Sequence, residues 1–132
     1  DGFIIKLDGD GELIWKKIYG GSSNDYLTDM AVTGSGGAIS VGFTESDETT
    51  LGSFHEGELD KLGLTYSDMW IFQVSRTGEM LWSDCYGGTL GDVATSISMC
   101  ADGFAVTGYT ASEDGDMPMN RGGFDIITLR FK

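Results

Sequence analysis

The sequence predicts an all-β protein built from repeated units of four short antiparallel strands. Its 132 residues include 21 glycines but a single proline, together with three Trp, five Tyr and seven Phe. Many glycines among aromatic and β-branched residues are typical of short strands joined by tight turns. No segment shows a sustained 3.6-residue apolar period, so we expect no helix.

The chain aligns with itself at an offset of 67 residues, and ten of the first 33 positions are identical between the two copies. The identities include Trp15 with Trp82. A third copy begins at Asp125. We therefore expect residues 1–132 to form one partial domain, made of a repeat at 1–67, a repeat at 68–124 and the start of a third repeat at 125–132.

Each full repeat contains four expected strands. In the first repeat they are residues 3–7, 13–19, 27–33 and 38–43, and in the second 69–74, 80–86, 94–100 and 104–109. Turns that contain glycine separate the first strand from the second and the third from the fourth, since glycine supplies the positive φ of tight hairpins. Four antiparallel strands per repeat favour the blades of a β-propeller over a solenoid.

A pattern of aspartate, glycine and tryptophan recurs in both copies. The first copy carries Asp1, Phe3, Lys6, Asp8, Gly11, Trp15, Gly20, Gly21, Asp25, Gly36, Gly37, Gly42 and Thr44. The second keeps Asp68, Trp70, Gly78, Trp82, Gly87, Gly88, Asp92, Gly103, Gly108 and Thr110. This pattern resembles the bacterial and archaeal beta-propeller repeat of the SBBP type, found in secreted and cell-surface proteins. The second copy departs from it at Gln73 and Ser75, where the family has Lys and Asp.

The resemblance implies an arrangement of blades and a location, but no activity, since such repeats serve as scaffolds in unrelated proteins. It implies that each blade runs from its innermost strand outward. The nine strands then divide into two, four and three, an incomplete ring. Because open blade faces would leave apolar side chains in water, we expect further blades from the same or another chain. The implied location is extracellular or at the cell surface of a bacterium or archaeon.

Asp25 and Asp92 end the Gly-Gly-x-x-x-Asp segments that cross from one blade to the next. The favoured interpretation is that each carboxylate accepts backbone N–H groups in its loop. The alternative is that these repeated carboxylates bind cations or sugars. With Phe54 and Tyr66, which give the long acidic loop between about Glu45 and Tyr66 some apolar surface, they are the ligand-binding candidates.

Two loops, residues 45–61 and 111–121, hold nine acidic residues and are expected at the same end as the crossings. A solvated acidic rim is the favoured interpretation. The alternative is calcium binding, with Asp47, Glu48, Asp114 and Asp116 as candidate ligands. No other cofactor is expected.

Tryptophan and glycine residues are assigned structural roles. Trp15 and Trp82 are expected to pack between neighbouring sheets, because the segment from Leu7 to Trp15 resembles the tryptophan-docking motif of pyrroloquinoline quinone propellers. Gly20, Gly21, Gly87 and Gly88 are expected to shape the crossings. Cys85 and Cys100 are too few for a disulfide framework, and we expect small buried hydrophobic residues, with a disulfide as the open alternative.

The charge balance limits the partners. Eight Lys and Arg against 21 Asp and Glu give a net charge of −13, which disfavours nucleic acid and anionic membranes. No apolar stretch is long enough for membrane insertion. His55 is the single histidine and no catalytic motif is complete, so we expect no enzyme.

The leading hypothesis is a module that binds protein or glycan through its acidic loops. The alternatives are a calcium-dependent adhesion or stability module, and part of a quinoprotein- or glycosidase-like propeller enzyme whose catalytic residues lie elsewhere.

Overall fold

The computed structural model describes residues 1–47, 51–52 and 66–132. The described residues form nine β-strands and no helix, which confirms the all-β prediction. The strands are β1 (Gly2–Leu7), β2 (Leu13–Tyr19), β3 (Asp25–Val32), β4 (Ala38–Thr44), β5 (Asp68–Val74), β6 (Met80–Tyr86), β7 (Asp92–Cys100), β8 (Gly103–Thr110) and β9 (Asp125–Phe131). No helix in these ranges could cross a membrane.

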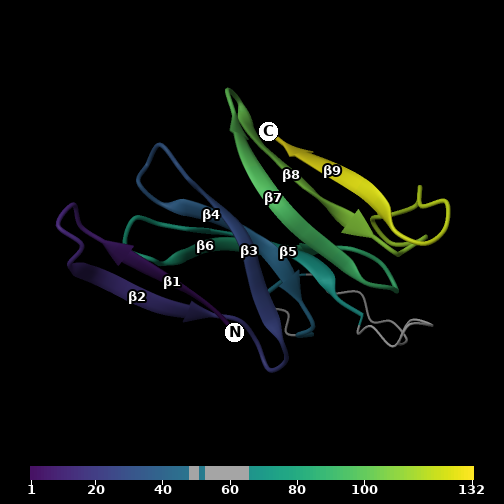
Figure 1. The fold of residues 1–132 in the computed structure, drawn as a ribbon, viewed down its shortest axis with the longest axis horizontal. Coiled ribbons are helices and arrows are strands. Elements are labelled where there is room, and N and C mark those ends of the chain that lie inside the picture. Colours follow the sequence, from purple (N-terminus) through teal and green to yellow (C-terminus); the bar gives the residue numbers. More distant parts are fainter. Residues whose placement is uncertain (48–50, 53–65) are drawn as a thin grey trace.

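The nine strands form three antiparallel sheets, with the orders β1-β2, β3-β4-β5-β6 and β7-β8-β9. This division into two, four and three strands agrees with the expected one. Hairpin turns lie toward the left and the top of Figure 1, and the starts of β3, β5, β7 and β9 lie toward the bottom and the right. We call these the hairpin end and the crossing end of the molecule.

Strand pairing extends to the crossing aspartates, which the sequence placed before the strands. β3 and β7 begin at Asp25 and Asp92, two residues earlier than expected. Asp25 is paired with Thr44 and Asp92 with Thr110, so the antiparallel ladder reaches the aspartate that ends each crossing. The crossing aspartates are thus fixed in register by the strands themselves.

The middle sheet is buried on both faces, and β5 is its most buried strand. On one face, Trp70, Phe72 and Val74 pack in a cluster with Ile4 and Tyr19 of the first sheet. On the other face, residues of β4 and β5 pack with the third sheet, in a cluster that comprises Ile39, Val41, Met69, Ile71, Ala94, Ile97, Phe104, Val106 and Met117. Since side chains alternate between the faces of a strand, one strand contributes to both cores.

The outer face of the first sheet is apolar and exposed. Phe3, Ile5 and Leu7 are 67%, 47% and 52% exposed, although their neighbour Ile4 is buried. Adding 67 to their numbers gives Trp70, Phe72 and Val74, which are at most 1% exposed. A face that is buried in the middle sheet is therefore open to solvent in the first.

Two hairpin turns reach the same geometry with different side chains. Asp8 Oδ1 accepts the N–H groups of Asp10 and Glu12, both at 2.9 Å. At the aligned turn, Ser75 Oγ accepts the N–H groups of Thr77 and Glu79 at 3.2 and 3.1 Å. The change from Asp8 to Ser75 between the two aligned turns thus preserves the turn, because a hydroxyl oxygen caps the same pair of amides as a carboxylate oxygen.

The two cysteines are both free thiols, and they differ in burial. Cys85 is 3% exposed in the core between the first two sheets, as expected. The expectation is wrong for Cys100, which is exposed. Cys100 is the last residue of β7, beside the turn to β8, where no neighbouring sheet covers it.

We expect one fast-reacting thiol in the native protein. Burial raises the pKa of the Cys85 thiol to about 12, and the nearby carboxylates of Asp68 and Asp84 act in the same direction. Because the thiolate is the reactive form, Cys85 should stay protonated and inert at pH 8. A colorimetric thiol reagent should modify one equivalent in buffer and two in urea.

Substitution assigns the reaction to its residue. Cys100→Ser should abolish the fast reaction in buffer, whereas Cys85→Ser should leave it unchanged. Fast native modification of Cys100→Ser would contradict the burial of Cys85.

Candidate functional site

The crossing end contains a hydrogen-bonded network around Asp92. The side chain is fully buried, and its Oδ2 accepts the N–H of Gly88 at 2.9 Å and the hydroxyl of Ser112 at 2.8 Å. Ser112 in turn donates its N–H to the Thr110 hydroxyl at 3.0 Å and accepts the N–H of Leu90 at 2.9 Å. One carboxylate thereby links the crossing before β7 to the loop that follows β8.

Asp25 makes nearly the same contacts in the first crossing. Its carboxylate accepts the N–H of Gly21 at 2.8 Å and the hydroxyl of Thr44 at 2.5 Å. Ser46 takes the place of Ser112, donating its N–H to Thr44 Oγ1 and accepting the N–H of Ser23, both at 2.9 Å. These contacts are those of the favoured interpretation, in which the carboxylates support backbone.

A third aspartate makes the same local contact, although its glycine pair, Gly122 and Gly123, lies two residues closer to the aspartate than in the crossings. Asp125 Oδ2 accepts the N–H of Arg121, four residues earlier, at 2.8 Å. Gly21 and Gly88 also lie four residues before their aspartates. The loop that leads into β9 is therefore closed in the same way as the crossings that lead into β3 and β7.

Glycine is required where the carboxylates approach the backbone. A Cβ at Gly20 would lie 2.5 Å from carboxylate oxygens of both Asp1 and Asp25, and the residue has a φ of +150°. A Cβ at Gly87 would collide with the carboxylates of Asp68 and Asp92. A larger residue at either position would displace these aspartates.

The second acidic loop folds over Gly87, Gly88 and Thr89. Asp114 Oδ1 accepts the Thr89 N–H at 2.8 Å, and Asp116 Oδ2 accepts the Gly87 N–H at 3.4 Å. A Cβ on Gly88 would again collide with Asp114. Met117, which is 2% exposed, anchors this loop in the core between the second and third sheets.

The structure does not bring together in one site the remaining candidate residues that it describes. Asp47 is exposed, and Tyr66 is half-buried just before β5. Glu48, Phe54 and His55 lie outside the described residues. Within the described ranges, no group of three or more His, Cys, Asp or Glu residues is arranged to hold a metal ion. Calcium binding stays a prediction.

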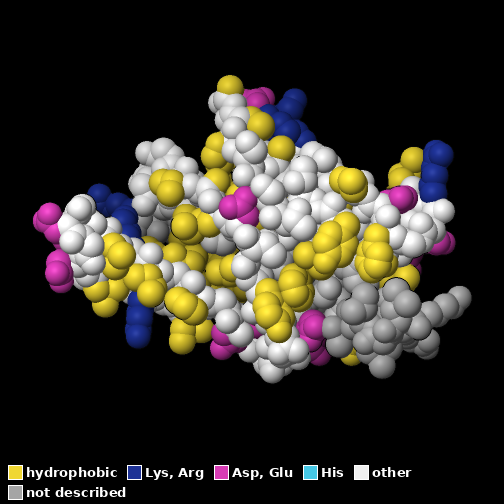
Figure 2. Space-filling model, viewed as in Figure 1, with side chains coloured by type: hydrophobic (Ala, Val, Ile, Leu, Met, Phe, Trp, Pro, Cys, Tyr) yellow, Lys and Arg dark blue, Asp and Glu magenta, His cyan; other side chains and the backbone are white. Residues whose placement is uncertain are grey.

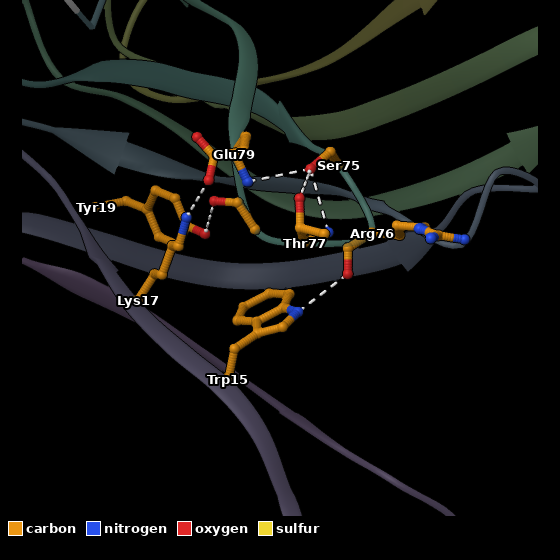
Figure 3. A network of polar contacts seen from close by, with 8 residues as sticks. Trp15, Lys17, Tyr19, Ser75, Arg76, Thr77 and Glu79 are labelled. Carbon is orange, nitrogen blue, oxygen red and sulfur yellow. Dashed lines mark hydrogen bonds and ion pairs between the residues drawn. The ribbon is translucent and has the colours of Figure 1, made fainter.

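Trp15 joins the first sheet to the second (Figure 3). Its indole Nε1 donates to the backbone oxygen of Arg76 at 3.0 Å, and the buried hydroxyl of Tyr19 donates to the backbone oxygen of Gly78 at 2.8 Å. Lys17 adds an ion pair with Glu79 at 2.7 Å, which lowers the pKa of the Glu79 carboxyl. The β5–β6 turn is thus held by polar contacts from β2.

Trp82 packs against the core cluster between the second and third sheets, as Trp15 does between the first and second. Its indole Nε1 donates to Gln73 Oε1 in its own sheet at 2.8 Å. Trp82 therefore keeps the packing of Trp15 with a different hydrogen-bond acceptor.

Sequence reasoning missed the residues that join β3 to β7. Thr28 and Thr95 occupy β-bulges 67 residues apart, and Thr28 Oγ1 contacts the Ala94 oxygen at 2.7 Å. Asp29 Oδ2 accepts the Ile97 N–H and the Ser96 hydroxyl, both at 2.9 Å. The hydrogen bond from Ile97 is the main cause of the lowered pKa of Asp29. The same residue type at Thr28 and Thr95 was the one sequence signal for this contact. A β-bulge has no characteristic residue spacing, so the sequence does not predict where it occurs.

Comparison with protein-family models finds no match to this chain, and comparison with curated protein sequences finds none either.

Asp92→Asn should destabilise the fold, because an amide cannot accept from both Gly88 and Ser112 through the same oxygen without leaving a buried N–H group unmatched. We expect a loss of about 1–3 kcal/mol in the free energy of unfolding, measured by urea denaturation. Asp10→Asn, a change at the exposed β1–β2 turn of the hairpin end, is the control and should change stability by less than about 0.5 kcal/mol. Equal midpoints for the two variants would contradict the assigned role.

Trp15→Phe tests the link between the first two sheets. The ring is retained but the hydrogen bond to Arg76 is lost, so the free energy of unfolding should fall by about 1 kcal/mol. Ile14→Val, at an exposed neighbouring position of β2, is the control and should change it little. Unchanged stability of Trp15→Phe would show that the indole contact contributes nothing.

Proposed function

We propose that this chain is a non-catalytic β-propeller repeat module of a secreted or cell-surface bacterial or archaeal protein. Its sheets act as blades, and its acidic crossing end presents a binding surface for a protein or glycan partner. The remaining blades come from the same or another chain and cover the apolar face that this chain leaves open.

The observation that carries the proposal is that the two interfaces between sheets use aligned residues. At the first interface, Ile4, Trp15 and Tyr19 belong to the same cluster as Trp70, Phe72 and Val74. At the second, Ile71, Trp82 and Tyr86 belong to the same cluster as Ile127, Leu129 and Phe131. Each residue of the second interface lies 67 or 57 positions after its counterpart in the first. Consecutive sheets thus pack through the same pair of unlike faces.

The exposed face of the first sheet continues this series. Phe3, Ile5 and Leu7 align with the residues that receive Trp15 and Tyr19 in the middle sheet. A preceding blade would cover them with its own Ile, Trp and Tyr. Gly9 and Gly11 align with Arg76 and Gly78, so their backbone oxygens would accept the incoming indole and phenol. An uncovered apolar face of this kind marks an interaction surface.

A binding role at the crossing end is supported by the distribution of charge. Ten described acidic residues lie at this end: Asp1, Asp25, Glu45, Asp47, Asp68, Asp92, Glu113, Asp114, Asp116 and Asp125. Arg121 is the one Lys or Arg side chain among the described residues there. Such a field attracts cationic and repels anionic partners. The crossing aspartates are engaged in holding backbone, which supports a scaffold better than a catalytic centre.

The mass of the native polypeptide tests the scaffold proposal. An antibody raised against the 132-residue chain would isolate the native protein for intact mass spectrometry and for a solution mass. We expect either a polypeptide much heavier than 14.2 kDa, or a 14.2 kDa chain in a ring-like oligomer. A native monomer of 14.2 kDa would overturn the proposal.

The isolated chain offers a second measurement. It should bind the dye ANS at the face formed by Phe3, Ile5 and Leu7, and Ile5→Lys should reduce the dye fluorescence. Thr107 is exposed on β8 of the third sheet, so Thr107→Lys adds the same charge away from this face, is the matched control and should leave the fluorescence unchanged. A failure of Ile5→Lys to lower it would show that this face is not the dye's site.

A further inference from the structure

We propose that an aromatic groove at the crossing end binds an arginine or lysine side chain from an extended, cationic protein segment. The groove lies between the start of the β3–β4 hairpin and the start of the third sheet. This inference rests on the proposed function, because it assigns a partner class and a contact point to the acidic end.

Two aromatic pairs form the walls of the groove. Tyr26 stacks on Phe43 with ring centroids 4.7 Å apart and an interplanar angle of 20°. Tyr109 meets Phe124 edge to face, 5.5 Å apart at 89°. Tyr26, Tyr109 and Phe124 are 51%, 39% and 49% exposed. Figure 2 shows apolar side chains gathered over this part of the molecule.

The groove encloses about 260 Å³, and Glu45 is the one charged side chain among the described residues that line it. Glu45 is held in place from Asn24, whose Nδ2 donates to Glu45 Oε2 at 2.7 Å and whose backbone oxygen accepts the Glu45 N–H at 2.9 Å. Beneath the aromatic rings, the Asp92 N–H donates to the Ser67 oxygen at 2.6 Å. The Asn24–Glu45 contacts hold the ends of β3 and β4 together, and the Asp92–Ser67 contact joins the middle sheet to β7, so the groove is formed before any partner arrives.

The chemistry of the lining selects a cation. Aromatic faces attract ammonium and guanidinium groups through the ring quadrupole, and a carboxylate beside them adds an ion pair. The volume is below the roughly 300–1,000 Å³ of small-molecule sites, which favours one side chain over a ligand of several rings. The acidic residues at this end would also speed the approach of a cationic segment.

A neutral glycan is the competing occupant. It would stack on the same tyrosines but would gain nothing from the net charge of −13. A cationic segment uses both the aromatic surface and the charge, so it accounts for more of what the groove contains.

The test uses a capped pentapeptide with one arginine among glycine and serine, and its twin in which neutral citrulline replaces arginine. Binding to the full chain is followed by NMR shifts of the tyrosine rings at low salt. We expect the citrulline peptide to bind at least about five-fold more weakly, since it lacks the charge that the rings and Glu45 recognise. Added salt should weaken the arginine peptide alone.

Matched variants locate the contact. Tyr26→Ala and Glu45→Gln should each weaken the arginine peptide about five-fold. Phe3→Ala and Asp10→Asn, which remove an exposed aromatic ring and an exposed acid elsewhere, should leave binding unchanged. Tyr26→Leu, which keeps apolar bulk but removes the aromatic face, replaces Tyr26→Ala if that variant unfolds.

Three results would overturn the inference. Maltotriose could shift the groove tyrosines while the arginine peptide does not. The arginine peptide could bind equally well to the groove variants, which would leave the acidic end as a binding surface and remove only the groove. The third result is that neither the arginine peptide nor maltotriose binds the protein. The scaffold proposal is tested independently, because only a native monomer of 14.2 kDa would contradict it.

Discussion

The burial of the middle sheet on both faces is the constraint on which the rest of this structure depends. A sheet with one solvated face can alternate polar and apolar residues, but β5 must place Trp70, Phe72 and Val74 on one side and Met69 and Ile71 on the other. Such a strand has no stable place at a surface. It requires a sheet on each side, and the short first sheet and the three-stranded third sheet supply them.

The crossings solve the problem that this stacking creates. A chain that leaves one sheet must enter the next within a few residues, and its backbone N–H groups would otherwise be buried without acceptors. Asp25 and Asp92 accept these groups from within the ladder, and glycine at positions 20 and 87 lets the carboxylates come close. The acidity of this end is therefore in part a consequence of the fold, and only the exposed remainder is available to a partner.

Much of the fold could be predicted because its signals are local. Turn glycines and the repeat located eight strands to within two residues and placed the start of the ninth segment at Asp125, and the position of Asp92 after a glycine pair indicated its role. Other features depend on tertiary context. The environments of Cys85 and Cys100 differ because one strand end is covered and the other is not, and no local pattern carries that information. The groove draws Tyr26, Phe43, Tyr109 and Phe124 from four separate segments, so only the packing of the sheets reveals that they meet.

The interface between sheets has a geometric consequence. Its two faces are unlike, so joining one sheet to the next always leaves another copy of the face that was just covered. Such a head-to-tail series has no terminator of its own. It ends only when the rotations between successive sheets sum to a full turn, and otherwise it grows as an open helical array. If further sheets are added as proposed, small changes in the angle set by Trp15 and the β5–β6 turn would decide between a closed ring and a fibre.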